Sequence, residues 1–135
     1  MATAGYSGTP LAKKLGIKPG FLLKLINEPA HYFELFSDMP GDIVVSKATK
    51  DIDFIHCFTA TLSDLEKQIP KLRKQIKPNG TIWISWYKKS AKIPTDVTED
   101  LIRDIALANG LVDVKVCAVD EQWSGLKLVI PVKDR

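Results

Sequence analysis

Two adjacent residues, His56 and Cys57, are a base and a nucleophile of the kinds that enzymes pair in covalent catalysis. They lie in the apolar run of residues 52–58, which has the length and composition of a strand. Neighbours on a strand point to opposite faces of a sheet, so the two side chains cannot contact each other. We expect both to be interior residues and predict no catalytic residue. The remaining His31 and Cys117 add no metal-ligand spacing, so we predict no metal site.

The first candidate binding segment is the glycine-containing loop of residues 5–10, GYSGTP, with lysines at 13 and 14. Amides at the start of a helix and the helix dipole attract anions, and nearby lysines strengthen that attraction. The spacing from loop to lysine differs from that of a P-loop, so nucleotide triphosphate chemistry has no support. The alternative is a hinge that docks the first helix. The candidate ligand-binding residues here are Tyr6, Ser7, Gly8, Thr9 and Lys13.

The second candidate segment is Trp86, Tyr87 and Lys88, at the carboxyl end of a strand expected to be central. Open parallel sheets place their ligands beyond the carboxyl ends of their strands. Aromatic walls with flanking cations suit a planar anionic ligand, so residues 86–89 are a candidate crevice. The alternative is that Trp86 only completes the core.

A third cluster is basic: Lys67, Lys71 and Lys74 recur at helical spacing, and Arg73 and Lys77 widen the face. Such a face can contact the phosphates of a nucleic acid. The net charge of +3 is modest, and no aromatic residues are interleaved, which favours a simply solvated face. Association with nucleic acid therefore stays an alternative.

Apolar runs of strand length alternate with helical patterns along the chain, which predicts a parallel sheet covered on both faces. Pro70 lies inside the longest helical pattern and predicts a kink or restart near Gln68. The KPNG stretch of residues 77–80 predicts a turn. Strands are expected at residues 21–26, 43–45, 52–58, 81–87, 111–119 and 126–131, and helices at 10–15, 29–36, 61–76 and 96–109. The third helix should bury the stripe of Leu62, Leu65, Ile69, Leu72 and Ile76. The fourth should be capped by Thr95 or Asp96 and have Val97, Leu101, Ile105 and Ala108 on one face.

The connector of residues 120–125 is too short for a helical crossover, so the last two strands should pair antiparallel. The prediction is one α/β domain, residues 1–135: a three-layer α/β/α sandwich with a mainly parallel, Rossmann-like sheet and an antiparallel last strand. No apolar tract is long enough to span a bilayer and no export signal is visible, so we expect a cytoplasmic protein. Two cysteines are too few for a disulfide framework, so we expect free thiols.

The block of residues 53–131 resembles the second half of class I S-adenosylmethionine-dependent methyltransferases. The resemblance lies in the order of a DFIHCF strand, a helix, a KPNGTIWISW turn and strand, a helix ending at ANG, and paired last strands. The opening string GYSGTPLAKKLG is similar to that of a small, mostly bacterial family with a domain of unknown function. The first resemblance implies a methyltransferase-like fold. The second gives no indication of an activity, because the function of that family is unassigned.

The exit of the first strand departs from the methyltransferase pattern. Those enzymes place a glycine-rich turn there, because glycine permits close approach and unusual backbone angles. Here the exit reads Asn27, Glu28, Pro29, and no glycine occurs between Gly20 and Gly41. The second strand also ends without the carboxylate that would hold the ribose. We therefore expect no cofactor and judge S-adenosylmethionine unlikely to bind.

The function expected from these observations is a non-catalytic, methyltransferase-like domain that binds a small anionic ligand or a protein partner. Two alternatives remain. One is an enzyme of unknown reaction that uses the crevice at residues 86–89. The other is a nucleic-acid-associated protein that uses the basic face at residues 67–77.

Overall fold

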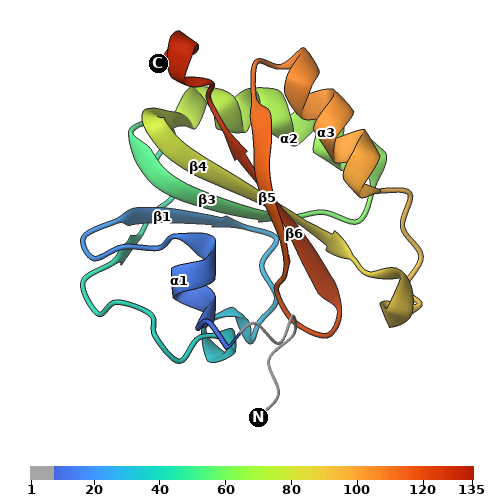
Figure 1. The fold of residues 1–135 in the computed structure, drawn as a ribbon, viewed down its shortest axis with the longest axis horizontal. Coiled ribbons are helices and arrows are strands. Elements are labelled where there is room, and N and C mark those ends of the chain that lie inside the picture. Colours follow the sequence, from blue (N-terminus) through green and yellow to red (C-terminus); the bar gives the residue numbers. More distant parts are fainter. Residues whose placement is uncertain (1–7) are drawn as a thin grey trace.

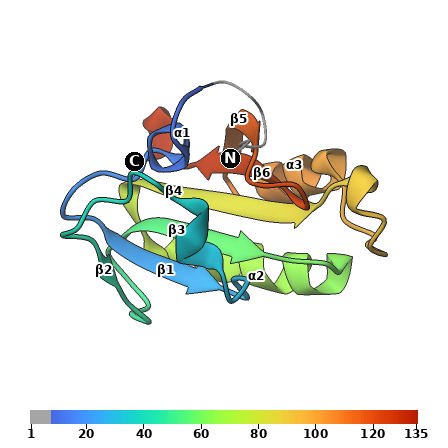
Figure 2. The same ribbon diagram turned by 90° about the horizontal axis from the view of Figure 1, so that it is seen from below.

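Six strands pair into one sheet in the computed structural model, which describes residues 8–135. The sheet order is β2-β1-β3-β4-β6-β5, with the short β2 at one edge and β5 at the other (Figures 1 and 2). β1 to β4 run parallel, and β6 runs antiparallel to both of its neighbours. The strands are β1 (Leu22–Ile26), β2 (Val44–Val45), β3 (Ile52–Phe58), β4 (Ile76–Tyr87), β5 (Val112–Ala118) and β6 (Trp123–Val129).

Helices cover both faces of this sheet, which confirms the predicted α/β sandwich. The long α2 and α3 lie beside each other and pack on one face, in a core of aliphatic side chains (Figure 1). The short α1 and η1 pack on the other face, in a core richer in aromatic rings. The helices are α1 (Leu11–Leu15), α2 (Leu62–Gln75) and α3 (Glu99–Ala108), with 3-10 turns η1 (Tyr32–Leu35), η2 (Lys89–Ala91) and η3 (Val132–Asp134).

The central strand β4 joins the two cores, as its large side chains on both faces predict. Ile82 and Ile84 belong to the core under α2 and α3, whereas Trp83 belongs to the core under α1. The Trp83 indole Nε1 also donates a 2.9 Å hydrogen bond to the Leu15 carbonyl. Burial of the ring and this bond together hold the end of α1 against the sheet.

The KPNG stretch does not end a helix as a free turn, because the strand assignment runs through it. β3 and β4 pair at Ile52↔Ile76 and next at Phe54↔Thr81, so residues 77–80 lie opposite Asp53 alone. The expected turn is therefore present as a bulge inside the strand pair. Asp53 stabilises it, since its carboxylate accepts from the Leu22 amide at 2.8 Å and contacts Lys77 Nζ at 2.9 Å.

Two expectations about the helices are wrong. Pro70 does not interrupt α2, which is assigned as one helix from Leu62 to Gln75. The hydrogen bond that Pro70 cannot make is offset by the burial of Ile69 and Leu72 on either side of it.

The cap and buried face of α3 also differ from the prediction. Thr98 is the N-cap, accepting from the Leu101 amide at 3.2 Å. Val97 is buried as expected and Ile105 packs against the core, but the fully buried residues of the helix are Ile102 and Ala106, and the expected Leu101 and Ala108 are not buried. Asp96, expected as the cap of this helix, instead accepts from the Leu62 amide at 2.7 Å and so caps α2.

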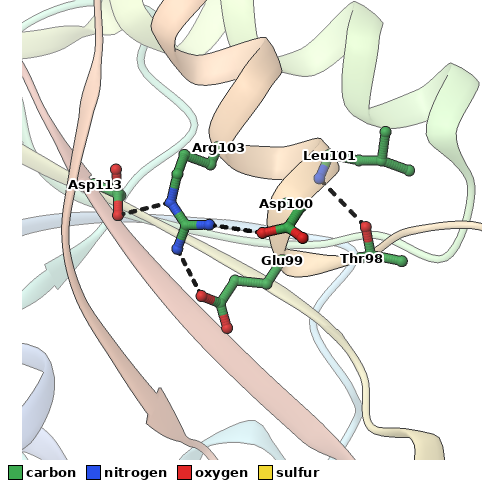
Figure 3. A network of polar contacts seen from close by, with 6 residues as sticks. All are labelled: Thr98, Glu99, Asp100, Leu101, Arg103 and Asp113. Atoms are coloured by element: carbon green, nitrogen blue, oxygen red, sulfur yellow. Dashed lines mark hydrogen bonds and ion pairs between the residues drawn. The ribbon is translucent and has the colours of Figure 1, made fainter.

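An ion-pair network fixes α3 to the edge strand β5 (Figure 3). Arg103 contacts Glu99 at 2.6 Å and Asp100 at 2.9 Å on its own helix, and Asp113 of β5 at 3.0 Å. The hydrogen bonds that Arg103 donates to Glu99 and Asp113 raise the pKa of the guanidinium, which keeps it charged. Because Arg103 is paired with all three carboxylates, we assign it a structural role.

No helix in the described part of the chain is both long and apolar enough to cross a membrane.

Candidate functional site

The strand order reverses between β1 and β3, because β2 lies on one side of β1 and β3 on the other. Open α/β sheets bind ligands at such a reversal, just beyond the carboxyl ends of the strands. Asn27 and Glu28 leave β1 at this position and Thr59 leaves β3. Asn27 and Glu28 are both exposed, so this edge is open to solvent.

Asn27 makes the turn at the exit of β1, where the methyltransferase pattern has glycine. Its φ is +56°, in the left-handed region that asparagine tolerates better than other non-glycine residues. The side-chain Nδ2 donates to the Phe58 carbonyl at 3.3 Å, which joins the ends of β1 and β3. A sharp turn at the exit of the first strand is therefore present without glycine.

The loop from β3 into α2 is held by side chains of its own. Thr59 Oγ1 donates to Asp64 Oδ2 at 3.0 Å, and the Thr59 amide donates to the Ser85 carbonyl of β4 at 3.0 Å. Thr61 caps α2 by accepting from the Asp64 amide at 3.2 Å. These bonds fix the floor beside Asn27, while the Glu28 carboxylate next to it faces solvent.

A buried polar chain lies behind this edge. The Tyr32 hydroxyl is 2.9 Å from His56 Nδ1, and Ser85 Oγ is 2.7 Å from His56 Nε2. Because a hydroxyl both donates and accepts, the neutral imidazole is satisfied in either tautomer. Burial lowers the pKa of His56 to about 3, and burial together with the charge of Glu28 raises the pKa of Tyr32. His56 is thus a neutral core residue, as its position on a strand predicts.

The neighbouring thiol is equally enclosed. Cys57 is fully buried on the opposite face of β3, in the core under α2 and α3. Burial, and secondarily the charge of Asp64, raise its pKa to about 12, which keeps the sulfur protonated and unreactive. Among residues 8–135 no group of three His, Cys, Asp or Glu side chains is placed to hold a metal ion.

The candidate residues of the first segment are only partly placed. Tyr6 and Ser7 lie outside the described residues, and Gly8 takes a φ of +74°. Thr9 and Lys13 line a hollow of 470 Å³ between α1 and β5. At the start of α1 the Ala12 and Lys13 amides are already bonded, because Asp38 accepts from both, each at 3.0 Å.

The second segment does not form one wall. Trp86 is buried in the core under α2 and α3, whereas Tyr87 lies on the other face and stacks on Trp123 at 4.0 Å between ring centroids. The Lys88 amide donates to the Gln122 carbonyl at 2.8 Å. Because the two aromatic side chains face apart, a ligand cannot lie between them, and binding by this segment stays a prediction.

The basic helix face is narrower than the sequence indicates. Arg73 Nε donates to the Gly110 carbonyl at 3.4 Å, and Lys77 pairs with Asp53. The lysines at 67, 71 and 74 are exposed on α2.

Three residues that were not predicted to belong to a binding site matter to these sites, and one of them, Cys117, was expected only as a free thiol. Asp38 caps α1 although it lies 25 positions after Lys13 in the sequence. Lys115 and Cys117 of β5 line the same hollow as Thr9 and Lys13. The alternating pattern of β5 does carry a signal for the last two, since it places residues 115 and 117 on one face.

No protein-family model matches the chain, and no curated protein matches it in sequence. The resemblance of its opening to a small bacterial family therefore stays a prediction.

Solved structures do match the fold. An S-adenosylmethionine-dependent methyltransferase from Aquifex aeolicus covers 89% of this chain and 88% of its own, at 17% identity and a TM-score of 0.62. Magnesium protoporphyrin IX methyltransferase from Synechocystis with bound S-adenosylmethionine covers 89% and 74%, at 14% identity and a TM-score of 0.56. Fibrillarin from Aeropyrum pernix with natively bound S-adenosylmethionine covers 88% and 73%, at 13% identity and a TM-score of 0.58.

These matches correct the expectation that the chain has no cofactor and that S-adenosylmethionine does not suit it. That expectation rested on the missing glycine turn and on the missing carboxylate after the second strand, whereas the fold shared with proteins that hold S-adenosylmethionine covers 88 to 89% of the chain. Asn27 supplies the left-handed turn at that exit. The chain has a class I methyltransferase-like fold, and the resemblance extends to both of its halves.

Proposed function

We propose that this chain is a methyltransferase-like binding domain that takes S-adenosylmethionine, or its demethylated product, at the carboxyl ends of β1 and β3. The observation that carries the proposal is the open edge at the strand reversal, where Asn27 makes the turn and Glu28 offers a free carboxylate. The shared fold with proteins that bind this cofactor supports the same position.

The chemistry of the edge suits the ligand. S-adenosylmethionine carries a ribose diol and a positively charged sulfonium and amine, and a carboxylate is a natural acceptor or counter-charge for each. Glu28 is the exposed carboxylate that directly follows the turn. The aromatic residues behind it, Tyr32 and Phe58, are buried. Their rings meet edge to face with 5.8 Å between the centroids and form a rigid wall.

We assign binding rather than methyl transfer because the reactive groups near this edge are enclosed. His56, Cys57 and Ser85 are each completely buried, and His56 and Ser85 are bonded to each other. A general base must come within hydrogen-bond reach of the proton that it removes, which this imidazole cannot do without opening the core.

The test is isothermal titration of the purified chain with S-adenosylmethionine and with S-adenosylhomocysteine. Removing the charge with Glu28→Gln should weaken binding about tenfold, the usual effect of losing a charge-assisted hydrogen bond. Glu66→Gln, an exposed residue on α2, is the matched control and should leave the affinity unchanged.

A second variant tests the turn itself. Asn27→Val places a β-branched residue at a φ of +56° and should weaken binding without unfolding the sheet. Absence of binding of both ligands at millimolar concentration would refute the proposal. Conversion of S-adenosylmethionine to S-adenosylhomocysteine when acceptors from a cell extract are added would refute the binding-only role.

A further inference from the structure

A cluster of positive charge on the described surface lies where α1 meets β5, at the opposite side of the sheet order from β1. Three lysines, Lys13, Lys14 and Lys115, line the 470 Å³ hollow there. We call it the lysine hollow; its other lining residues are Thr9, Val116, Cys117 and Ala118. None of these described lining residues is acidic.

The fold holds two of these ammonium groups in place. Lys115 Nζ donates to the Lys14 carbonyl at 3.0 Å, and Lys14 Nζ donates to the Ala118 carbonyl at 3.3 Å. Both acceptors are neutral backbone atoms, so these bonds orient the cations without cancelling their charge. α1 and β5 are thereby joined across the hollow.

A bulge in β5 aims Lys115 at this place. β5 and β6 pair at Asp113↔Leu128 and next at Lys115↔Lys127, so Val114 is the extra residue. On one side of the bulge Asp113 bonds to Arg103 on the α3 face, and on the other Lys115 bonds to α1 on the opposite face. Without the extra residue, simple alternation would put both side chains on one face, where they would pair.

The resulting arrangement is unfavourable for the chain by itself. Lys115 lies directly opposite Lys127 on the antiparallel pair, and like charges in that position repel. Burial, and then the charges of Lys115 and Lys18, lower the pKa of Lys127. The same cations affect the thiol of Cys117. Burial raises the pKa of this thiol, and the charges of Lys14 and Lys115 partly oppose that rise. A bound anion would relieve this repulsion.

We propose that the lysine hollow binds a small phosphorylated compound, with the phosphate held by Lys13, Lys14 and Lys115 and the Thr9 hydroxyl. Lysine ammonium groups bind phosphate as point charges, and a hollow of this volume has the size of a small-molecule site. Cys117, which packs on the α1 face, offers an apolar surface to the carbon part of the ligand, and Val116 and Ala118 also line the hollow. The Ala12 and Lys13 amides take no part, because Asp38 accepts from both.

Cys117 provides a direct reporter of occupancy. It lines the hollow and is partly exposed, whereas the other thiol, Cys57, is completely buried. In the folded chain, iodoacetamide should therefore modify Cys117 alone. With pyrophosphate as the probe and sodium chloride added to keep ionic strength constant, we expect the rate of modification, followed by mass spectrometry, to fall at least about threefold at saturation. Titration calorimetry with pyrophosphate supplies the affinity.

Charge-neutral variants locate the effect. Lys13→Gln and Lys115→Gln should each lower the affinity for pyrophosphate by about threefold to tenfold, as the loss of one partly exposed ion pair to a polyanion predicts. Lys13 has an exposed side chain, so its variant stays informative if removal of Lys115 disturbs α1. Lys71→Gln on α2 makes the same charge change outside the hollow and is the matched control.

Three outcomes would overturn the proposal. They are no change in the modification rate with no measurable binding, an equal loss of affinity in the Lys71 variant, and binding of heparin without binding of pyrophosphate. The second would mean diffuse attraction of anions, and the third a surface for a nucleic acid.

Discussion

The buried imidazole of His56 predicts that the chain loses stability as the pH falls from 7.5 to 5. In the unfolded chain the imidazole has its ordinary pKa of 6.5 and takes up a proton below that value. In the folded chain burial keeps the pKa at about 3, so the ring stays neutral over the whole interval. The unfolded state thus binds more protons and is favoured as the pH falls, with the stabilising contribution complete above pH 6.5 and lost toward pH 3.

The magnitude follows from the same two values. Well below pH 6.5 the free energy of unfolding should fall by about 1.4 kcal/mol for each pH unit. Between pH 7.5 and 5 the loss should reach about 2 kcal/mol, because the first part of the interval lies above the pKa of the unfolded ring. Stopping at pH 5 keeps most carboxylates ionised, so their titration contributes little.

The assay is urea unfolding followed by tryptophan fluorescence at several pH values. All three tryptophans, Trp83, Trp86 and Trp123, are buried and report loss of the core. With an m-value typical of a small domain, the midpoint should move down by about 1 to 2 M urea. His56→Gln should lower stability at pH 7.5 but remove this dependence on pH, whereas His31→Gln, outside the core, should retain it. The reasoning fails if the parent protein is equally stable at pH 7.5 and 5, or if the two variants show the same slope.

Three further substitutions test other contacts. Tyr32→Phe deprives the buried imidazole of one partner and should cost about 1 to 3 kcal/mol in urea unfolding; a loss below about 0.5 kcal/mol would show that the bond contributes little. Asp38→Ala exposes two amides of α1 and should cost about 1 to 2 kcal/mol and speed hydrogen exchange in α1 but not in the sheet, with Asp38→Asn restoring part of the loss; uniform exchange would argue against a local cap. Gly80→Ala sets a methyl group 2.9 Å from the Ile76 Cβ and should cost about 1 to 3 kcal/mol by thermal unfolding; an unchanged melting temperature would mean that the bulge is loose.

Features that depend on short stretches of sequence could be predicted. β3 occupies residues 52–58 as its apolar composition indicates, and α2 buries Leu65, Ile69 and Leu72 from the expected stripe. The antiparallel pairing of the last strands followed from the length of their connector. Each of these depends on hydrophobic period or loop length, which neighbouring residues determine.

Features that depend on distant partners could not. Asp96 reads as a cap for the helix that follows it, yet it caps α2, whose first residue lies 34 positions earlier. Asp38 likewise caps α1 across 26 positions. Asn27 takes the left-handed turn because its amide reaches the Phe58 carbonyl on a neighbouring strand. A local pattern contains the residue type in each case, but the sheet order supplies the partner.

The lysine hollow is the clearest case of a site that tertiary structure creates. Asp113 and Lys115 share one face in a regular strand, so sequence alone predicts that they neutralise each other or are solvated together. The bulge at Val114 separates them, giving the carboxylate to Arg103 and the ammonium to the α1 side. The Asp113 carboxylate thereby pairs with Arg103 of α3, and Lys115 lies near other lysines instead of a carboxylate. Like charges directly opposite each other disfavour the free protein, so an anion bound among these cations would relieve the repulsion that the bulge creates.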